Sequence, residues 1–461
     1  MKTSRCLVLA LCLLGQSAMA QTTVDIPIDE ARVIATRALL AGETELALQI
    51  AQGLLQANPD DRAALLVVAA GAPRAGDAAA GRRAGARAYA LSQTDTQRYE
   101  AARLTALAAA NEERFTLATF WLRRALTVVP NEQERERTLA DAAGLRRVNP
   151  WSTNLGFAIV PSNNVNGGAD ENDVDDLGGL QGNLSADALA LAGVRASLNF
   201  STQYRFYQSP RDRATVALQY QVARVRLQDE IVDNPQDRPD VEGDETVRVD
   251  AGAFATDYLQ LSLGYDRAFE AGTIGLQASI GTFEYGGDPY YDFQRLRLTG
   301  AIPLSDPLVL QLSARREWQD YESTTIGEVV RTTLNAGLSY RLDSGDRISA
   351  TLGSTDSDGQ GPSQTFEDWS LRFGYSFAEP VGPASLSLNA GVKFADYPVF
   401  FNTTDGREDE TFFYGVNIGF PDIEYAGFVP GLSIDGSQSE SNVGRFTRNS
   451  LSVAFTINSA F

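Results

Sequence analysis

The segment "SLSVAFTINSAF" (450–461) decides the fold. From Leu451 to Ile457 its odd positions carry Leu, Val, Phe and Ile, whereas its even positions carry Ser, Ala, Thr and Asn. Side chains of a strand point alternately to opposite faces, so the segment predicts a strand with one apolar face and one small or polar face. The last strand of a soluble sandwich would show the same alternation. The rest of the chain must therefore decide between a soluble sandwich and a membrane barrel.

The same alternation recurs from Trp151 onward, for example in "LVLQLSARREW" (308–318), "RTTLNAGLSYRL" (331–342) and "ASLSLNAGVKF" (384–394). Short turns alternate with longer loops between these segments. The short turns are 209–213, 270–273, 305–307, 343–346, 380–383 and 426–428, and the longer loops are 163–188, 228–247, 286–290, 322–328, 356–364, 398–410 and 439–445. This pattern predicts a 14-stranded antiparallel transmembrane β-barrel over 149–461. Aromatic residues near the strand ends, such as Trp318 and Trp369, also favour a barrel over a sandwich.

The first part of the chain has a helical period instead. "DEARVIATRALLAGETELALQIAQGLLQANPDD" (29–61) and "AARLTALAAANEERFTLATFWLRRALTVVPNE" (101–132) both place apolar residues at helical spacing and end at a proline. Pro59 and Pro130 lie 71 residues apart, about twice the tetratricopeptide period. We predict an α-helical domain over 21–148 with three tetratricopeptide-like repeats and a capping helix. An unrelated helical bundle is the alternative. The predicted fold class is thus α+β multidomain.

The N-terminus and the composition limit the function. Lys2, Arg5, the apolar run 6–14 and Ala18-Met19-Ala20 predict a signal peptide over 1–20. The chain has no histidine, and both of its cysteines, Cys6 and Cys12, lie in this leader. Histidine-based catalysis, thiol nucleophiles and most zinc sites are therefore excluded from the mature chain. We predict no enzymatic activity and no cofactor, and the net charge of -20 argues against nucleic acid as a partner.

The junction "NPWSTNLGFAIVPSNNVNGG" (149–168) carries the most specific motif in the chain, with the residues Pro150, Trp151, Pro161, Asn163, Asn164 and Asn166. Together with the ending "AGFVPGLSIDGSQSESNVGRFTRNSLSVAFTINSAF" (426–461), it resembles the surface lipoprotein assembly modulator (Slam) family. The resemblance implies a periplasmic tetratricopeptide domain, a barrel in the outer membrane of a Gram-negative bacterium, and a client lipoprotein or secreted protein that is helped to the cell surface. An exopolysaccharide exporter and a diffusion porin are the alternatives.

Further site predictions follow from the strand pattern. Phe461 is predicted to be the insertion signal that the barrel-assembly machinery reads. Charged residues on the polar faces are candidates for the lumen wall: Arg295, Arg297, Arg315, Glu317, Arg331, Arg341 and Lys393.

The acidic runs 170–176 and 229–245 lack the spacing of a calcium loop. We expect them to be solvated outer loops in contact with lipopolysaccharide. The seam between 151–160 and 449–461 is predicted to open, because Pro150 and Pro161 cannot donate backbone hydrogen bonds.

Overall fold

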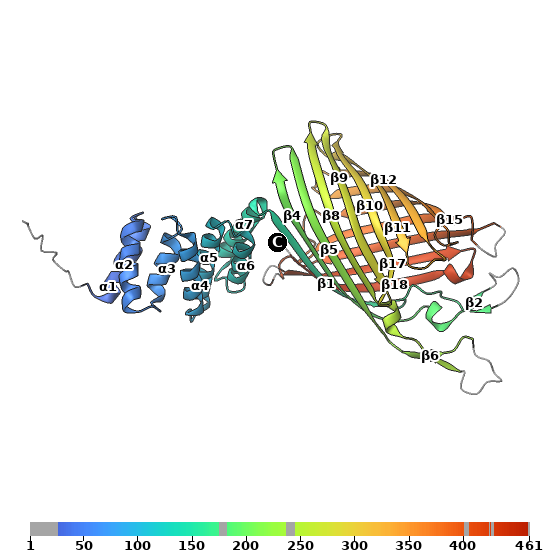
Figure 1. Cartoon of the computed structure of the whole chain (residues 1–461), viewed down its shortest axis with the longest axis horizontal. Helices are drawn as coiled ribbons and strands as arrows, with labels where there is room; N and C mark the ends of the chain where they lie inside the picture. The colour runs from blue at the N-terminus through green and yellow to red at the C-terminus, as the bar shows by residue number, and fades with distance from the viewer. Residues whose placement is uncertain are drawn as a thin grey trace, which may run out of the picture. The chain divides into compact units, whose positions relative to one another are not determined.

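The computed structural model describes residues 26–174, 182–236, 245–400, 405–423, 425 and 428–459 (Figure 1). The predicted signal peptide and Phe461 lie outside these residues. The chain divides into two compact units, one up to Glu112 and one from Glu113 onward. The change from helix to strand comes later, between Val148 and Trp151, so the last two helices belong to the same compact unit as the strands.

The first unit consists of the helices α1 (Ile28–Leu40), α2 (Thr44–Ala57), α3 (Arg62–Gly71), α4 (Ala78–Ala90) and α5 (Asp95–Asn111). Each helix packs on the next, and α1 contacts α3 as α3 contacts α5. The interior is built mainly from alanine, and Ala47, like Ala118 in the second unit, is fully buried. A Cβ atom at Gly85 would lie 2.4 Å from Thr105 Oγ1, so α4 and α5 approach closely. The tetratricopeptide assignment itself stays a prediction.

Asp61 links three parts of the first unit. Its Oδ1 accepts from Ala64 N at 3.1 Å and so caps α3, and its Oδ2 lies 2.7 Å from Arg32 Nη2 on α1. Burial opposes ionisation of this carboxyl, but the hydrogen bonds from Arg32 and from the α3 backbone outweigh it, so the pKa of Asp61 lies below its ordinary value of 3.8. The neighbouring Asp60 pairs with Arg87 on the exposed surface.

We predict that Asp61→Ala lowers the free energy of unfolding of a purified 21–112 fragment by about 2 kcal/mol, because a helix cap and a buried ion pair are lost together. Asp60→Ala should cost about 0.5 kcal/mol or less, since exposed ion pairs contribute little. Urea unfolding followed by circular dichroism measures both. The folded pKa of Asp61 is depressed, so its contribution is present above pH 3.8 and is lost as the pH falls through the folded value. Equal effects of the two substitutions would contradict this account.

The second unit begins with α6 (Phe115–Leu126) and α7 (Glu132–Val148) and continues into one closed antiparallel barrel (Figure 1). The barrel strands are β1 (Trp151–Ser162), β4 (Gly193–Gln208), β5 (Asp212–Leu227), β8 (Thr256–Phe269), β9 (Gly272–Tyr285), β10 (Asp288–Pro303), β11 (Leu308–Tyr321), β12 (Glu328–Arg341), β13 (Arg347–Gly359), β14 (Phe366–Ser376), β15 (Ser385–Tyr397), β16 (Arg407–Gly419), β17 (Phe428–Ser441) and β18 (Arg448–Ser459). Each strand pairs with its neighbours in chain order, and β1 closes the barrel against β18. The predicted 14-stranded barrel and the overall fold class are confirmed.

Chain connections differ between the two barrel ends. At the end that holds Trp151 and Ser459, which we call the short-turn end, the strands are joined by brief turns such as the two residues Glu270 and Ala271 between β8 and β9. At the opposite, long-loop end, two of the loops form small sheets of their own, β2 (Asp173–Val174) with β3 (Gly182–Asn183) and β6 (Ile231–Asp233) with β7 (Thr246–Arg248).

One predicted loop is wrong. Residues 286–290 were expected to form a longer loop, but β9 and β10 are joined by Gly286 and Gly287 alone, with φ of 67° and 91°. Positive φ at both central residues is the geometry of a two-residue hairpin turn whose twist matches that of the strands. Glycine adopts it without steric cost, so the pair Gly-Gly is itself the signal for a tight hairpin.

The two faces of the barrel wall differ in chemistry. Large apolar side chains such as Leu276, Leu334 and Phe373 stay more than half exposed on one face. Along each strand the alternating face carries small, polar and charged residues. In a soluble sandwich the apolar faces would be buried against each other, whereas here the apolar face surrounds a closed barrel and must meet lipid. No helix among the described residues is long and apolar enough to cross a membrane.

Candidate functional site at the barrel seam and lumen

Within the part of the chain that the structure describes, the seam between β1 and β18 is the shortest strand pairing in the barrel. On its other side, β1 pairs with β4 continuously from Trp151↔Tyr204 to Ser162↔Gly193. Against β18, the described residues form five pairs, four of them running from Gly156↔Asn458 to Ile159↔Phe455 and the fifth being Ser162↔Ser452. Val160 and Pro161 have no partner on β18, and proline has no N–H to offer. Among the described residues, the seam therefore has fewer register pairs than any other strand pair of the barrel.

Asn163 of the junction motif holds the long-loop end of the seam. Its Oδ1 accepts from Leu451 N at 2.8 Å, and its own N–H points to Leu451 O at 3.4 Å. Beyond it, Asn449 Nδ2 donates to Asp170 Oδ2 at 2.6 Å, and Arg448 Nη1 donates to Gly167 O at 3.2 Å. Side-chain hydrogen bonds thus replace strand pairing where the pairing stops. Such bonds can break without unravelling the flanking strands.

The other two asparagines of the motif fold the first outer loop. The buried Asn164 accepts from Gly168 N and donates to Gly168 O, both at 2.8 Å. Asn166 Nδ2 donates to Leu189 O at 2.6 Å, and its Oδ1 accepts from Leu191 N at 2.9 Å. Between them, Val165 anchors a small apolar core, which contains Ala186, Leu191, Leu227, Val249 and Phe254. The motif therefore has a structural role at the mouth of the barrel.

We predict that Asn164→Ala makes the 163–191 loop much more sensitive to protease, because two buried backbone groups lose their partners at about 1–3 kcal/mol each. Asn183→Ala is the matched control, since Asn183 is exposed and its amide donates only to Pro235 O among the described residues. Limited proteolysis of the detergent-solubilised protein, with the cleavage sites read by mass spectrometry, measures the effect. Unchanged cleavage in Asn164→Ala would show that the amide does not hold the loop.

At the short-turn end, α6 and α7 are tied to the strands that flank the seam. Arg123 Nη2 on α6 donates to Ser459 Oγ at 2.8 Å, and its guanidinium lies 5.4 Å from the ring centroid of Phe428. On the β4 side, Arg205 N donates to Pro150 O at 2.8 Å, and the ring of Trp151 lies 4.7 Å from that of Tyr204. Pro150 and Trp151 thus fix the point where the helical segment becomes β1.

The predicted lumen residues lie on the face opposite the apolar one, and several of them neutralise each other. Arg295 donates through Nε to Glu317 and through Nη1 to Gln260 Oε1 at 2.7 Å. On another wall, Lys393 Nζ lies 3.0 Å from Asp368 Oδ2. Arg341 lies at the short-turn end, where its Nη2 is 3.5 Å from Asp306 O. These residues have structural partners.

Three other arginines among the predicted lumen residues have fewer hydrogen-bond partners or none. Arg331 Nε donates to Ser357 Oγ at 3.2 Å, and Arg315 Nη2 donates to Thr333 Oγ1 at 3.1 Å. Arg315 Nε is buried and has no hydrogen-bond partner among the described residues. Arg297 is exposed to the lumen and has neither an ion pair nor a side-chain hydrogen bond within the described part of the chain. The sequence pattern could not separate these arginines from Arg295.

Sequence reasoning missed one cluster at the long-loop end. The guanidinium of Arg407 lies 3.6 Å from the ring centroids of both Tyr397 and Phe446, and its Nη2 lies 2.8 Å from Asp409 Oδ2. Arg407 is buried by this arrangement. Phe446 comes from the last loop and Tyr397 from the end of β15, so the contacts join distant segments. No local sequence signal marks them.

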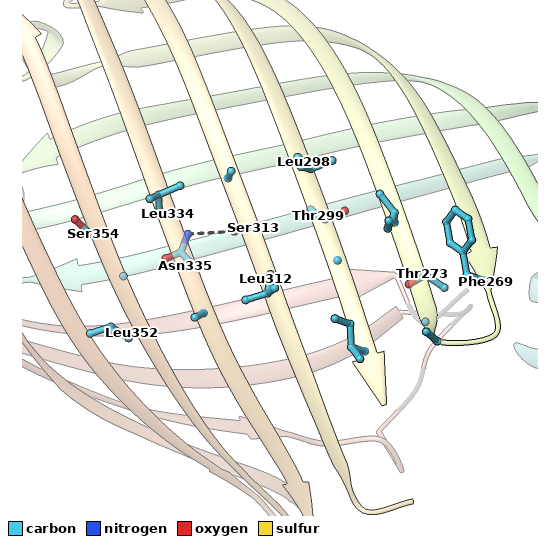
Figure 2. Close-up of a pocket in the computed structure, with 18 residues that line it drawn as sticks. Phe269, Thr273, Leu298, Thr299, Leu312, Ser313, Leu334, Asn335, Leu352 and Ser354 are labelled. Carbon is cyan, nitrogen blue, oxygen red and sulfur yellow. Dashed lines mark hydrogen bonds between the residues drawn. The ribbon is translucent and has the colours of Figure 1, made fainter. Parts of the chain in front are cut away.

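An apolar hollow of 640 Å³ lies on the membrane face of β9 to β13 (Figure 2). Leu298, Leu312, Leu334 and Leu352 project around it, while small residues such as Gly300, Ala314 and Ala336 leave the space between them. Its lining suits the hydrocarbon of a lipid. Because β11 and β12 lie across the barrel from β1 and β18 in the strand order, the hollow is separate from the seam.

Among the described residues, no group of three or more His, Cys, Asp or Glu side chains could hold a metal ion. The acidic runs 170–176 and 229–245 extend into residues outside the described part of the chain, namely 175–181 and 237–244. The expectation that these runs are solvated loops therefore stays a prediction.

Residues 253–461, from just before β8 to the end of the chain, match the family model of surface lipoprotein assembly modifiers. No curated protein sequence is significantly similar to the chain. Among solved structures, Acinetobacter baumannii OccAB3 has a TM-score of 0.35 and 10% identity over 67% of this chain and 98% of that one. Pseudomonas aeruginosa OccK2 in complex with glucuronate has a TM-score of 0.34 and 14% identity over 67% and 98%. At such TM-scores these two likenesses carry no weight for function.

Proposed function

Because residues 253–461 match the family model of surface lipoprotein assembly modifiers and form most of a closed outer-membrane barrel, we propose that this protein is a translocation factor. It helps a client protein, either a surface lipoprotein or a secreted protein, to reach the cell surface. The observation that carries the proposal beyond the family match is the short β1–β18 seam, since a plain diffusion pore has no use for a weak strand pair.

The proposed arrangement assigns a side of the membrane to each part. Residues 1–20 are a signal peptide, and residues 21–148 are a periplasmic tetratricopeptide-like domain that receives the client. Residues 149–461 are the barrel, with its short-turn end toward the periplasm and its long loops toward lipopolysaccharide, as is general for bacterial outer-membrane barrels. The barrel-assembly machinery is the proposed partner during insertion. The protein carries out no catalysis and needs no cofactor.

A lipid-anchored client poses two different transport problems. Its polypeptide needs a hydrated path, which the polar inner face of the barrel offers. Its acyl chains cannot follow through a wet lumen, because exposing them to water costs about 0.8 kcal/mol per CH₂ group. A seam that opens toward the membrane lets the acyl chains stay in lipid while the polypeptide crosses. The seam, with five register pairs among the described residues, is where this opening breaks the fewest of them.

Deletion of the gene tests the proposal. Surface proteins of the deletion strain and its parent are shaved with protease and compared by mass spectrometry. We expect one or a few surface proteins to be lost from the deletion strain while their total cellular amount persists. Loss of a surface polysaccharide with an unchanged protein surface would identify an exopolysaccharide exporter instead. Slower uptake of small solutes alone would identify a porin.

A further inference from the structure

The lumen face of β10, β11 and β12 carries five arginines and a single carboxylate. Arg295, Arg297, Arg315 and Arg331 are grouped around the carboxylate Glu317, and Arg341 lies apart from them at the short-turn end. Glu317 lies directly opposite Arg295 on one side and Arg331 on the other. Glu317 is buried, and it also accepts from Gln319 Nε2 at 2.6 Å, so both of its carboxylate oxygens already have hydrogen-bond donors. This wall of the lumen therefore keeps a surplus of positive charge in a chain whose net charge is -20.

Two of these arginines oppose each other directly. Arg297 on β10 is the register partner of Arg315 on β11. Like charges directly opposite on neighbouring strands are destabilising unless an anion lies between them. The described residues supply no such anion: Arg297 has no ion pair there, and Arg315 Nε is buried without a partner. The pair therefore places two positive charges side by side in the middle of both strands.

The space next to Arg297 can receive an anion. A hollow of 220 Å³ adjoins it on the lumen side, lined by uncharged polar residues that include Gln203, Ser262 and Gln277. Asp266 also lines this hollow, but its Oδ2 accepts from Arg213 at 2.9 Å and 3.0 Å, so its charge is compensated elsewhere. The neighbouring side chains thus provide room and hydrogen bonds without competing negative charge.

Two cations on another wall of the lumen are neutralised, in contrast to Arg297 and Arg315. On β14 to β16, Lys393 pairs with Asp368 and Arg407 pairs with Asp409. The outer face of β13 to β17, near the long loops, instead carries carboxylates: Asp356, Glu367, Asp396, Glu408, Glu410 and Glu440. An acidic polymer would be repelled from the outer rim and attracted to β10–β12, so the charge distribution favours an acidic chain inside the barrel.

We propose that Arg297 and Arg315, extended by Arg331, form a binding surface for the carboxylates of an acidic, extended segment of the client as it passes through the lumen. This rests on the proposed function and names the chemical class of the client. Guanidinium groups bind carboxylates through charge-assisted hydrogen bonds. Neighbouring strands lie about 4.8 Å apart, so arginines on three consecutive strands present a row that a chain with repeated acidic residues can follow and that a single small anion cannot fill.

The test uses the full-length protein in nanodiscs and a fluorescein-labelled Glu-Gly-Ser repeat peptide as the probe. Fluorescence anisotropy should show binding that weakens with added salt, and the same peptide with Gln in place of Glu should not bind. Arg297→Gln with Arg315→Gln should weaken binding about tenfold or more, since charge-assisted contacts are lost. The Lys pair, Arg297→Lys with Arg315→Lys, should retain most of the affinity.

The matched control is Arg341→Gln with Arg347→Gln, which removes two register-paired charges on the same lumen face at the short-turn end. Heat-modifiable gel mobility establishes that every variant is folded. Equal binding of the two peptides, equal loss in the control pair, or full competition by free glutamate at the same carboxylate concentration would overturn the proposal. None of these results depends on the deletion experiment, so a failure of the anion site and a failure of the transport function are distinguishable.

Discussion

A disulfide across the seam should abolish client display while the barrel stays folded. Gly156 and Asn458 are register partners on β1 and β18, and Gly156→Cys with Asn458→Cys places two thiols at antiparallel cross-strand distance, about 4.5–5.5 Å between Cα atoms. The chain's two cysteines, Cys6 and Cys12, lie in the predicted signal peptide, so no other thiol competes. Under oxidising conditions the surface protein identified by the deletion comparison should disappear from the surface, and reductant should restore it.

The matched control uses the same first cysteine. Gly156→Cys with Asn199→Cys joins β1 to β4 at a register pair within the continuous pairing on the other side of β1. That cross-link leaves the seam free, so display should continue under oxidising conditions. Full display with the β1–β18 bond in place would exclude lateral release and leave passage through the lumen alone. Loss of display in both variants would point to a general effect of the cross-links.

Replacing the terminal aromatic should prevent most of the protein from reaching the membrane. Phe461 lies outside the described residues, and in the sequence it keeps the odd-numbered spacing of Leu451, Phe455 and Ile457, which are exposed on β18. Aromatic residues prefer the membrane interface. We expect Phe461→Ala to reduce the folded, heat-modifiable form sharply, and Phe461→Tyr to preserve it. Normal folding of Phe461→Ala in cells would show that the terminal aromatic is not read during assembly.

The strand pattern by itself determined the barrel. Period-two alternation fixes which side chains share a face, and the lengths of turns and loops fix the order in which antiparallel strands pair. These are local properties, so they can be read from one sequence. The exception at Gly286 and Gly287 is local too, because two glycines in a row signal a two-residue turn, and loop length alone concealed it.

The helical half was predicted in outline for the same reason, since a helical period and a terminal proline are local signals. The sequence placed the domain boundary at 148/149, and the division into compact units after Glu112 was not predicted. The helices α6 and α7 group with the barrel rather than with α1–α5, and this depends on contacts such as Arg123 to Ser459, which are separated by 336 residues. Contacts at such separation leave no periodic trace in the sequence.

The charged residues of the lumen were also predicted only in part from the sequence. The sequence proposed seven charged lumen residues as one class, and only the tertiary structure separated Arg295, which is neutralised by Glu317, from Arg297, which faces Arg315. The two arginines are two positions apart on one strand and share a face, so composition and period cannot tell them apart. What differs is the residue that the register places opposite each, and register is set by pairing with the neighbouring strand. The sequence therefore determines which residues line the barrel, and strand pairing decides which of them keep an uncompensated charge.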